Sequence, residues 1–161
     1  IRGRTTEMLA ALAAYTDHPV LGVGPGQYLP YYSVRYQALP EISIRDIPLP
    51  RRAHNLYLEV AAETGTVGLV IFMAIPLLLL ADLGRLRRTL FAWRPDLARL
   101  AAGFTLVLLA YLGTGVFLHL AFERYYWVMV ALTASVVGML EQAAQPEPIG
   151  ALDPLAEAAW A

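Results

Sequence analysis

The segment "RRAHNLYLEVAAETGTVGLVIFMAIPLLLLA", residues 51–81, joins a polar turn to a long apolar run. Its last 18 residues, 64–81, carry no charged side chain, and this length and composition suit a membrane-spanning helix. Pro76 lies inside the run, where a membrane helix tolerates proline more readily than a soluble helix does. The segment therefore predicts a helix that enters a membrane directly after a turn rich in arginine and histidine.

Two further apolar runs follow, and together the three runs predict membrane spans at about 62–81, 99–119 and 125–141. The third run opens with "YYW", residues 125–127, which is typical of the aromatic belt at a membrane surface. A soluble helical core is the alternative, but the chain is 58% hydrophobic and 16% charged. Soluble domains average about 45–50% apolar residues and about 25% charged residues. We therefore expect an all-α, polytopic membrane protein with about three transmembrane helices.

An arginine-rich segment, 82–98, separates the first two spans, and the positive-inside rule predicts that it is a cytoplasmic loop. Residues 1–61 then form an outer, periplasmic or extracellular region, and the turn 119–124 lies on that same side. The tail, 142–161, is rich in Pro, Ala and Glu and is expected to be disordered and cytoplasmic.

The region before the first span predicts a helix over 5–15, a glycine-rich turn over 21–28 and one short helix around 31–38. The turn contains "GVGPG", with Gly22, Gly24 and Gly26. Its backbone N–H groups could cradle a phosphate, or the segment is a plain tight turn. The nearby tyrosines could stack on sugar rings or lie at a bilayer interface.

The composition excludes several classes of function. A net charge of −1 gives no field that would attract nucleic acid, and the absence of cysteine excludes disulfides and thiol chemistry. The three histidines lack the spacing of metal ligands, so we expect no metal site and no cofactor. All twelve basic residues are arginine, whose planar fork suits phosphate recognition better than lysine does.

The turn before the first span places a histidine beside two arginines. An imidazole titrates near neutral pH, so His54 could serve as a general base. Arg51, Arg52 and the following helix N-terminus should favour the neutral imidazole and attract anions. A base beside an anion site is what transfer from a phosphate-activated donor requires. The alternative is a surface histidine at a helix start, with both arginines against lipid headgroups.

The helix that follows this turn has its own supporting residues. Asn55 is a favourable N-cap residue for it. Glu59 and Glu63 are spaced four residues apart on it, so they share one face. These three residues should fix the backbone that carries the histidine.

Two motifs in this order carry a family resemblance. "DHPVLGVGPGQY", residues 17–28, and "AHNLYLEVAAETGTVGLVIF", residues 53–72, resemble the C-terminal part of the O-antigen ligase / O-antigen polymerase superfamily. The resemblance implies a GT-C-like fold and a multi-pass enzyme of the bacterial inner membrane. It further implies transfer of a glycan from an undecaprenyl-pyrophosphate donor to an acceptor glycan, to lipid A core or to a protein hydroxyl.

The resemblance also assigns roles to individual residues. His54 matches the family's loop histidine, which is expected to deprotonate the acceptor hydroxyl. Arg4 matches best the arginine that holds the donor pyrophosphate, and Arg2 is the second choice. Arg51 and Arg52 add to this anion site, and arginines rather than a metal neutralise the leaving group.

Some alternatives stay open on the sequence alone. The chain opens with Ile1 and lacks the family's earlier membrane bundle, so we expect a fragment that is inactive alone. O-antigen ligation, chain polymerisation and protein O-glycosylation require the same chemistry. A non-enzymatic transporter or scaffold segment is the competing class, but it predicts charged residues within the spans, and the apolar runs 64–81 and 125–140 of the first and third spans carry none.

Overall fold

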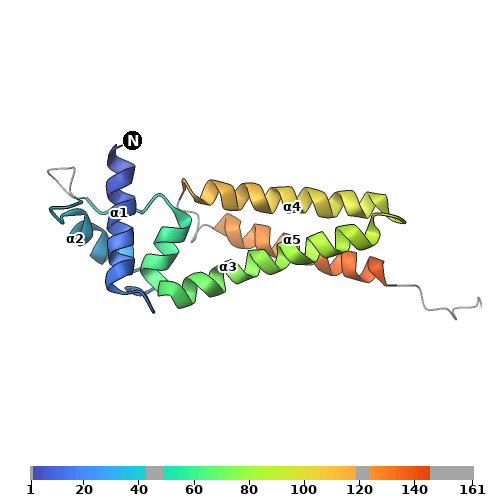
Figure 1. Cartoon of the computed structure of the whole chain (residues 1–161), viewed down its shortest axis with the longest axis horizontal. Helices are drawn as coiled ribbons and strands as arrows, with labels where there is room; N and C mark the ends of the chain where they lie inside the picture. Colours follow the sequence, from blue (N-terminus) through green and yellow to red (C-terminus); the bar gives the residue numbers. More distant parts are fainter. Residues whose placement is uncertain (1, 43–48, 119–123, 146–161) are drawn as a thin grey trace, which may run out of the picture.

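The computed structural model describes residues 2–42, 49–118 and 124–145, and all regular structure in these ranges is helical. The elements are α1 (Arg2–Asp17), a short π-helix η1 (Tyr28–Tyr32), α2 (Ser33–Gln37), α3 (Leu56–Leu90), α4 (Pro95–Gly115) and α5 (Arg124–Ala144). Helices α3, α4 and α5 run along the long axis, and α1 stands across one end of them with α2 beside it (Figure 1). The predicted all-α fold is confirmed.

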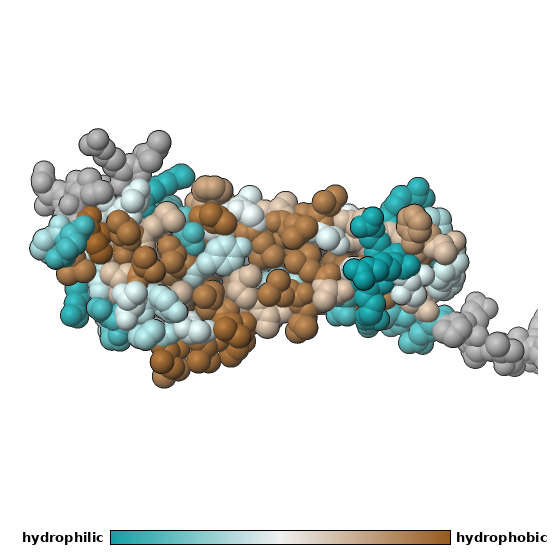
Figure 2. Space-filling view, viewed as in Figure 1, coloured by the Kyte–Doolittle hydropathy of each residue, from teal (hydrophilic) through white to brown (hydrophobic). Residues whose placement is uncertain are grey.

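Three of these helices are long and apolar enough to cross a membrane. They are Leu56–Leu90, Pro95–Gly115 and Tyr125–Ala144, and each contains an 18-residue stretch apolar enough for a membrane span, with mean hydropathies of 2.4, 1.6 and 1.4. Many of their large apolar side chains are exposed, including Val70, Leu78 and Leu106 at 61–68%. Apolar residues gather over the middle of the bundle (Figure 2), as expected of a surface that faces lipid tails. The prediction of three membrane helices is confirmed.

Helix α3 turns a corner at Gly65, which has φ 64° and ψ −166° in an otherwise helical segment. The corner separates a short segment, 56–64, from a long one, 66–90 (Figure 1). The long segment measures about 37 Å at 1.5 Å per residue, slightly more than the hydrocarbon thickness of about 30 Å. The short segment therefore belongs with α1 at the end of the bundle rather than with the membrane span.

The glycine-rich loop fills the corner by satisfying the backbone groups that the break releases. The N–H groups of Val23 and Gly24 donate to the carbonyls of Ala62 and Glu63 at 2.8 and 2.9 Å. In return, the N–H of Thr66 donates to the carbonyl of Pro19 at 2.8 Å. Helix ends normally leave such groups unpaired, and here two sequence motifs pair them with each other.

Close backbone approach explains why glycine stands on both sides of this corner. A Cβ atom on Gly65 would collide with the carbonyl of Val20, and one on Gly22 would collide with the backbone of Glu63. Both residues also have positive φ, at 64° and 69°. Only glycine adopts this backbone conformation without steric cost.

The observed helix bounds differ from the predicted ones at the arginine-rich segment. We predicted a loop over 82–98, but α3 continues to Leu90 and α4 begins at Pro95. Leu83, Leu86 and Leu90 pack against α4 and α5. This packing explains why the helix continues past Ala81, where the uncharged run ends. Four of the five arginines within 85–99 therefore lie on helices, and Arg94 lies at the end of the short turn between them. The predicted turn 119–124 and tail 142–161 fall largely on 119–123 and 146–161, which lie outside the described residues.

Candidate functional site

The predicted base lies in the turn immediately before α3. His54 has φ 51°, in the left-handed region that non-glycine residues seldom adopt. Asn55 caps α3, since its Oδ1 accepts the N–H of Leu58 at 2.9 Å. Its Nδ2 donates to the carbonyl of Val116 at 3.0 Å, beside the C-terminus of α4. The backbone around His54 is thus tied both to its own helix and to the second membrane helix.

Glu59 fixes the same turn from the inside. Its side chain is buried, and its Oε1 accepts from Nη1 of Arg52 at 2.9 Å. Its Oε2 accepts the N–H of Ala53 at 3.3 Å. One carboxylate therefore holds the two residues that directly precede His54, and the half-exposed Arg52 stays at the edge of the site.

Glu63 performs a similar task for the glycine-rich loop. Its Oε2 accepts the N–H of Gly26 at 2.9 Å, and its backbone carbonyl accepts from Gly24. Gly24 and Gly26 both have positive φ. The loop N–H groups that could have cradled a phosphate thus point at a protein carboxylate and carbonyl. The three glycines shape the turn that packs against α3.

A buried carboxylate on α1 lies against His54. The distance from His54 Nε2 to Glu7 Oε2 is 3.4 Å, and that from Arg51 Nη1 to Glu7 Oε1 is 3.5 Å. The Glu7 side chain is 2% exposed, whereas those of His54 and Arg51 are 30% and 41% exposed. A charge that is buried in this way must be paired, and the two turn residues supply partners for it.

Tyr28 lies against the backbone of Glu7. It is fully buried, and its hydroxyl donates to the backbone carbonyl of Glu7 at 3.4 Å. Burial, reinforced by the negative charges of Glu59 and Glu7, raises the pKa of Tyr28 well above its ordinary value. The phenol therefore remains a hydrogen-bond donor at physiological pH. Tyr36 is also buried, whereas Tyr31 is 68% exposed.

The sequence reasoning missed Glu7 and the burial of Tyr28. Glu7 is the only charged residue in the predicted helix 5–15. A single charge on an otherwise apolar helix indicates that the charge has a partner elsewhere in the protein. That partner follows 47 residues later, and sequence alone does not show that α1 packs against the start of α3. Sugar stacking and a bilayer interface are the two roles predicted for Tyr28 and the nearby tyrosines, but Tyr28 is fully buried.

The other predicted arginines lie on α1. Arg4 is exposed, and it lies one turn before Glu7 on the same helix, so both side chains emerge on neighbouring positions of one face. It forms no ion pair with another described residue. Arg2 is part of α1, but its side chain lies outside the described residues. The structure therefore brings His54, Arg51 and Glu7 into contact and places Arg4 one helical turn away.

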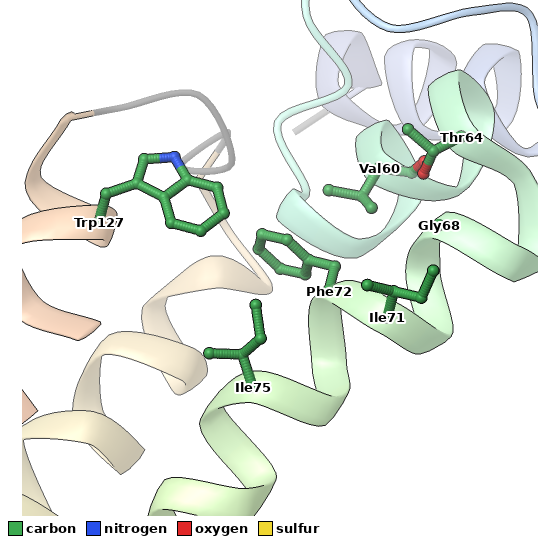
Figure 3. A pocket seen from close by; sticks show the side chains of 7 residues that line it. All are labelled: Val60, Thr64, Gly68, Ile71, Phe72, Ile75 and Trp127. Atoms are coloured by element: carbon green, nitrogen blue, oxygen red, sulfur yellow. The ribbon is translucent and has the colours of Figure 1, made fainter. Parts of the chain in front are cut away.

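An apolar groove of about 250 Å³ lies on the inner side of the α3 corner, between α3 and α5 (Figure 3). Its lining comprises Val60, Thr64, Gly68, Ile71, Phe72, Ile75 and Trp127. The groove begins on the same short segment, 56–64, whose first turn carries Asn55 as its cap. Within the described ranges, no three His, Asp or Glu side chains gather in a way that would hold a metal ion.

Comparison with known proteins gives one match. Residues 1–73 match the family model described as O-antigen ligase. The matched segment contains α1, the glycine-rich loop, the His54 turn and the corner of α3, which are the parts that build the site. It confirms the resemblance seen in the two motifs. No curated protein and no solved structure shows significant similarity to the chain.

Proposed function

We propose that the protein is a glycosyltransferase that moves a glycan from a polyprenyl-pyrophosphate donor to an acceptor hydroxyl at the outer face of the bacterial inner membrane. The observation that carries the proposal is the contact of His54 with the buried Glu7. This contact lies beside exposed arginines, at the end of three membrane helices and within the segment that matches O-antigen ligases.

His54 acts as the general base in this mechanism. A carboxylate 3.4 Å from Nε2 favours the tautomer with its proton on that nitrogen, so Nδ1 becomes the basic atom. Nδ1 takes the proton from the acceptor hydroxyl as its oxygen attacks the anomeric carbon of the donor sugar. The bond from that carbon to the phosphate oxygen breaks, and the polyprenyl pyrophosphate leaves with the bonding electron pair.

The arginines hold the donor and stabilise the departing pyrophosphate. Arg51 and Arg52 keep 41% and 33% of their side chains exposed, although each is paired with a buried carboxylate on its inner side. Each guanidinium can therefore offer its outer N–H groups to a ligand while the protein fixes its position. Arg4, and Arg2 as the second choice, would complete the clamp from α1. The mechanism assigns charge neutralisation to these arginines and gives no step to a metal ion or a cofactor.

The polyprenyl chain of the donor requires an apolar path that starts close to the base. The groove in Figure 3 supplies apolar walls from α3 and α5, including Phe72 and Trp127. It starts on the short segment 56–64 and faces the membrane span. This arrangement supports a lipid-linked donor over a soluble nucleotide sugar.

The acceptor decides which biological reaction the chemistry serves. Transfer to lipid A core is ligation, transfer to a second glycan is polymerisation, and transfer to a protein is O-oligosaccharyl transfer. All three use a hydroxyl nucleophile from the acceptor, one base and one pyrophosphate clamp, and in this proposal His54 is the base and the arginines are the clamp.

Transfer by the intact, purified protein in lipid tests the proposal. An undecaprenyl-pyrophosphate-linked glycan would be supplied with each of the three acceptor types, and both released polyprenyl pyrophosphate and glycosylated acceptor would be measured. We expect both products in equal amounts with at least one acceptor, and the same rate in the presence of EDTA. Donor that stays intact with all three acceptors, in a protein that also fails to bind it, would refute the proposed function.

A further inference from the structure

Two of the five arginines at the turn between α3 and α4 are neutralised by carboxylates. Arg85 lies 2.9 Å from Asp82 and 2.7 Å from Glu141 of α5. Arg94 lies 3.5 Å from Asp96. The Arg85–Glu141 pair joins α3 to α5, and the other two pairs are local in the sequence. The charges of Arg85 and Arg94 are therefore balanced within the protein.

The remaining three arginines, Arg87, Arg88 and Arg99, are exposed and form no ion pair with any residue in the described ranges. This end of the bundle thus carries five guanidinium groups against three carboxylates. Figure 2 shows a hydrophilic band here, directly beside the apolar middle of the bundle. The surplus positive charge is concentrated on the three unpaired arginines.

The same three arginines line two adjoining hollows on the α3–α4 surface. The first, of about 490 Å³, is lined by Gly84, Arg87, Arg88 and Phe91. The second, of about 200 Å³, is lined by Arg87, Phe91, Pro95, Ala98, Arg99 and Ala102. The two hollows share Arg87 and Phe91. Each hollow combines cationic groups with an apolar wall. Such a lining suits a ligand with both a charged and an apolar part better than it suits a small anion.

The position of the hollows along the bundle fits the membrane surface. Residues 66–85 of α3 span about 30 Å, so Arg87 and Arg88 lie just beyond the hydrocarbon core. Phe91 and Trp93 are 69% and 51% exposed at the same level, where aromatic side chains favour the headgroup region. Ala102 lies two helical turns into α4 from Pro95, so the second hollow reaches towards the acyl chains.

We propose that Arg87, Arg88 and Arg99 form a binding site for the phosphate headgroup of an anionic phospholipid, with its acyl chains against Phe91, Ala98 and Ala102. The guanidinium forks bind phosphate oxygens in pairs, and basic pockets between membrane helices are known sites for such headgroups. Arg87 lines both hollows, so a lipid with two phosphates can occupy them together. This site lies at the opposite end of the membrane helices from His54 and does not depend on the proposed catalysis.

Native mass spectrometry of the intact protein tests this site by counting the lipids it retains. The probes are diphosphatidylglycerol, phosphatidylglycerol and phosphatidylcholine, added in detergent at equal concentration. We expect retention in that order, with Arg87→Gln and Arg99→Gln each weakening diphosphatidylglycerol binding about tenfold, the loss of about 1.4 kcal/mol. Arg94→Gln is the matched control, because it removes the same charge from a paired arginine, and it should change binding less than twofold.

Two outcomes would overturn this site. If the protein retains the zwitterionic and anionic lipids equally, the arginines do not select the headgroup. If Arg87→Gln, Arg99→Gln and the control Arg94→Gln weaken lipid binding equally, the unpaired arginines have no special role. Competition by glycerophosphate, which has the headgroup without acyl chains, separates a lipid from a free phosphate. We expect no displacement at millimolar concentration, and full displacement would show that the apolar wall plays no part.

Discussion

At the scale of single residues, the contact between Glu7 and His54 changes the role that the histidine can take. A histidine at a helix start can be a simple surface residue, but this one has a left-handed backbone and a buried carboxylate at 3.4 Å. Residues held in such sparsely populated conformations gather at functional sites. We propose that Glu7 orients the imidazole and favours the tautomer that carries its proton on Nε2 and leaves Nδ1 free to accept one.

Glu7→Gln tests this orienting role. The amide keeps the shape of the carboxylate but loses its charge, so kcat should fall on the order of 10²–10⁴-fold, the usual range for acid–base groups. The KM for the lipid-linked donor should change much less. Glu41→Gln, an exposed carboxylate, is the control and should behave like the wild type. A raised donor KM with unchanged kcat would mean that Glu7 serves only to hold Arg51.

Arg4 can be tested by substitutions that separate charge from geometry. Arg4→Ala should lose most of the transfer activity in the intact protein. Arg4→Lys should lose much of it too, because a point charge does not replace a bidentate fork on a pyrophosphate. Arg35→Ala is the control, since Arg35 is exposed and its nearest aromatic contact is the Tyr36 ring at 6.0 Å. Full activity of Arg4→Ala at equal protein level would shift the assignment to Arg2.

At the scale of the elements, the corner of α3 is what brings the site together. Asn55 caps the short segment 56–64, which carries Glu59 and Glu63, while the long segment 66–90 has the length and composition of a membrane span. The glycine-rich loop locks the angle between them through hydrogen bonds to both sides of Gly65. The two motifs of the sequence, the glycine-rich loop and the entrance to the first span, therefore form one structural unit.

Substitution at the corner should therefore unfold the site. Gly65→Ala places a methyl group against the carbonyl of Val20 and forces a positive φ on alanine, so the stability loss should be on the order of 1–3 kcal/mol or more. Gly103→Ala is the matched control, because a Cβ there meets open space within a helix. Thermal unfolding in detergent would measure both. Equal melting temperatures for the two variants would show that the corner does not need its glycine.

The sequence predicted the membrane helices and the start of α3 for clear physical reasons. Uncharged runs about as long as a bilayer is thick identified all three membrane helices, and Asn55, as a favourable N-cap residue, indicated the start of α3. The corner at Gly65 was not predicted, because one glycine in an apolar run does not reveal the loop that packs on it. The arginines after Ala81 suggested a loop, although leucines at helical spacing continued α3 to Leu90.

At the scale of the whole molecule, the two ends of the bundle have different chemistry. One end carries α1, the buried carboxylates and His54, and the other carries the arginines of the α3–α4 turn. By the positive-inside rule we predict that the second end lies in the cytoplasm, which would place His54 at the periplasmic face. A lipid-linked glycan that is displayed on the outer leaflet would meet the site directly.

Single-cysteine labelling tests this orientation, and the chain contains no native cysteine to interfere. In intact spheroplasts, a membrane-impermeant thiol reagent should label Glu41→Cys and leave Ala92→Cys unlabelled, although both positions are exposed. After permeabilisation, both should react, which controls for reactivity. The reverse pattern in intact spheroplasts would invert the topology and place the site on the cytoplasmic side.

Turnover by His54→Gln in the intact protein bears most directly on the proposed catalysis. Glutamine retains a hydrogen-bonding group but cannot take the proton, so transfer should become undetectable, while the lipid-linked donor still binds with near wild-type affinity. Donor binding and the melting temperature, measured on the same preparation, show that the protein is folded and loaded. Near-normal turnover by His54→Gln under these conditions would contradict the assignment of His54 as the base and leave it only a role in positioning the acceptor.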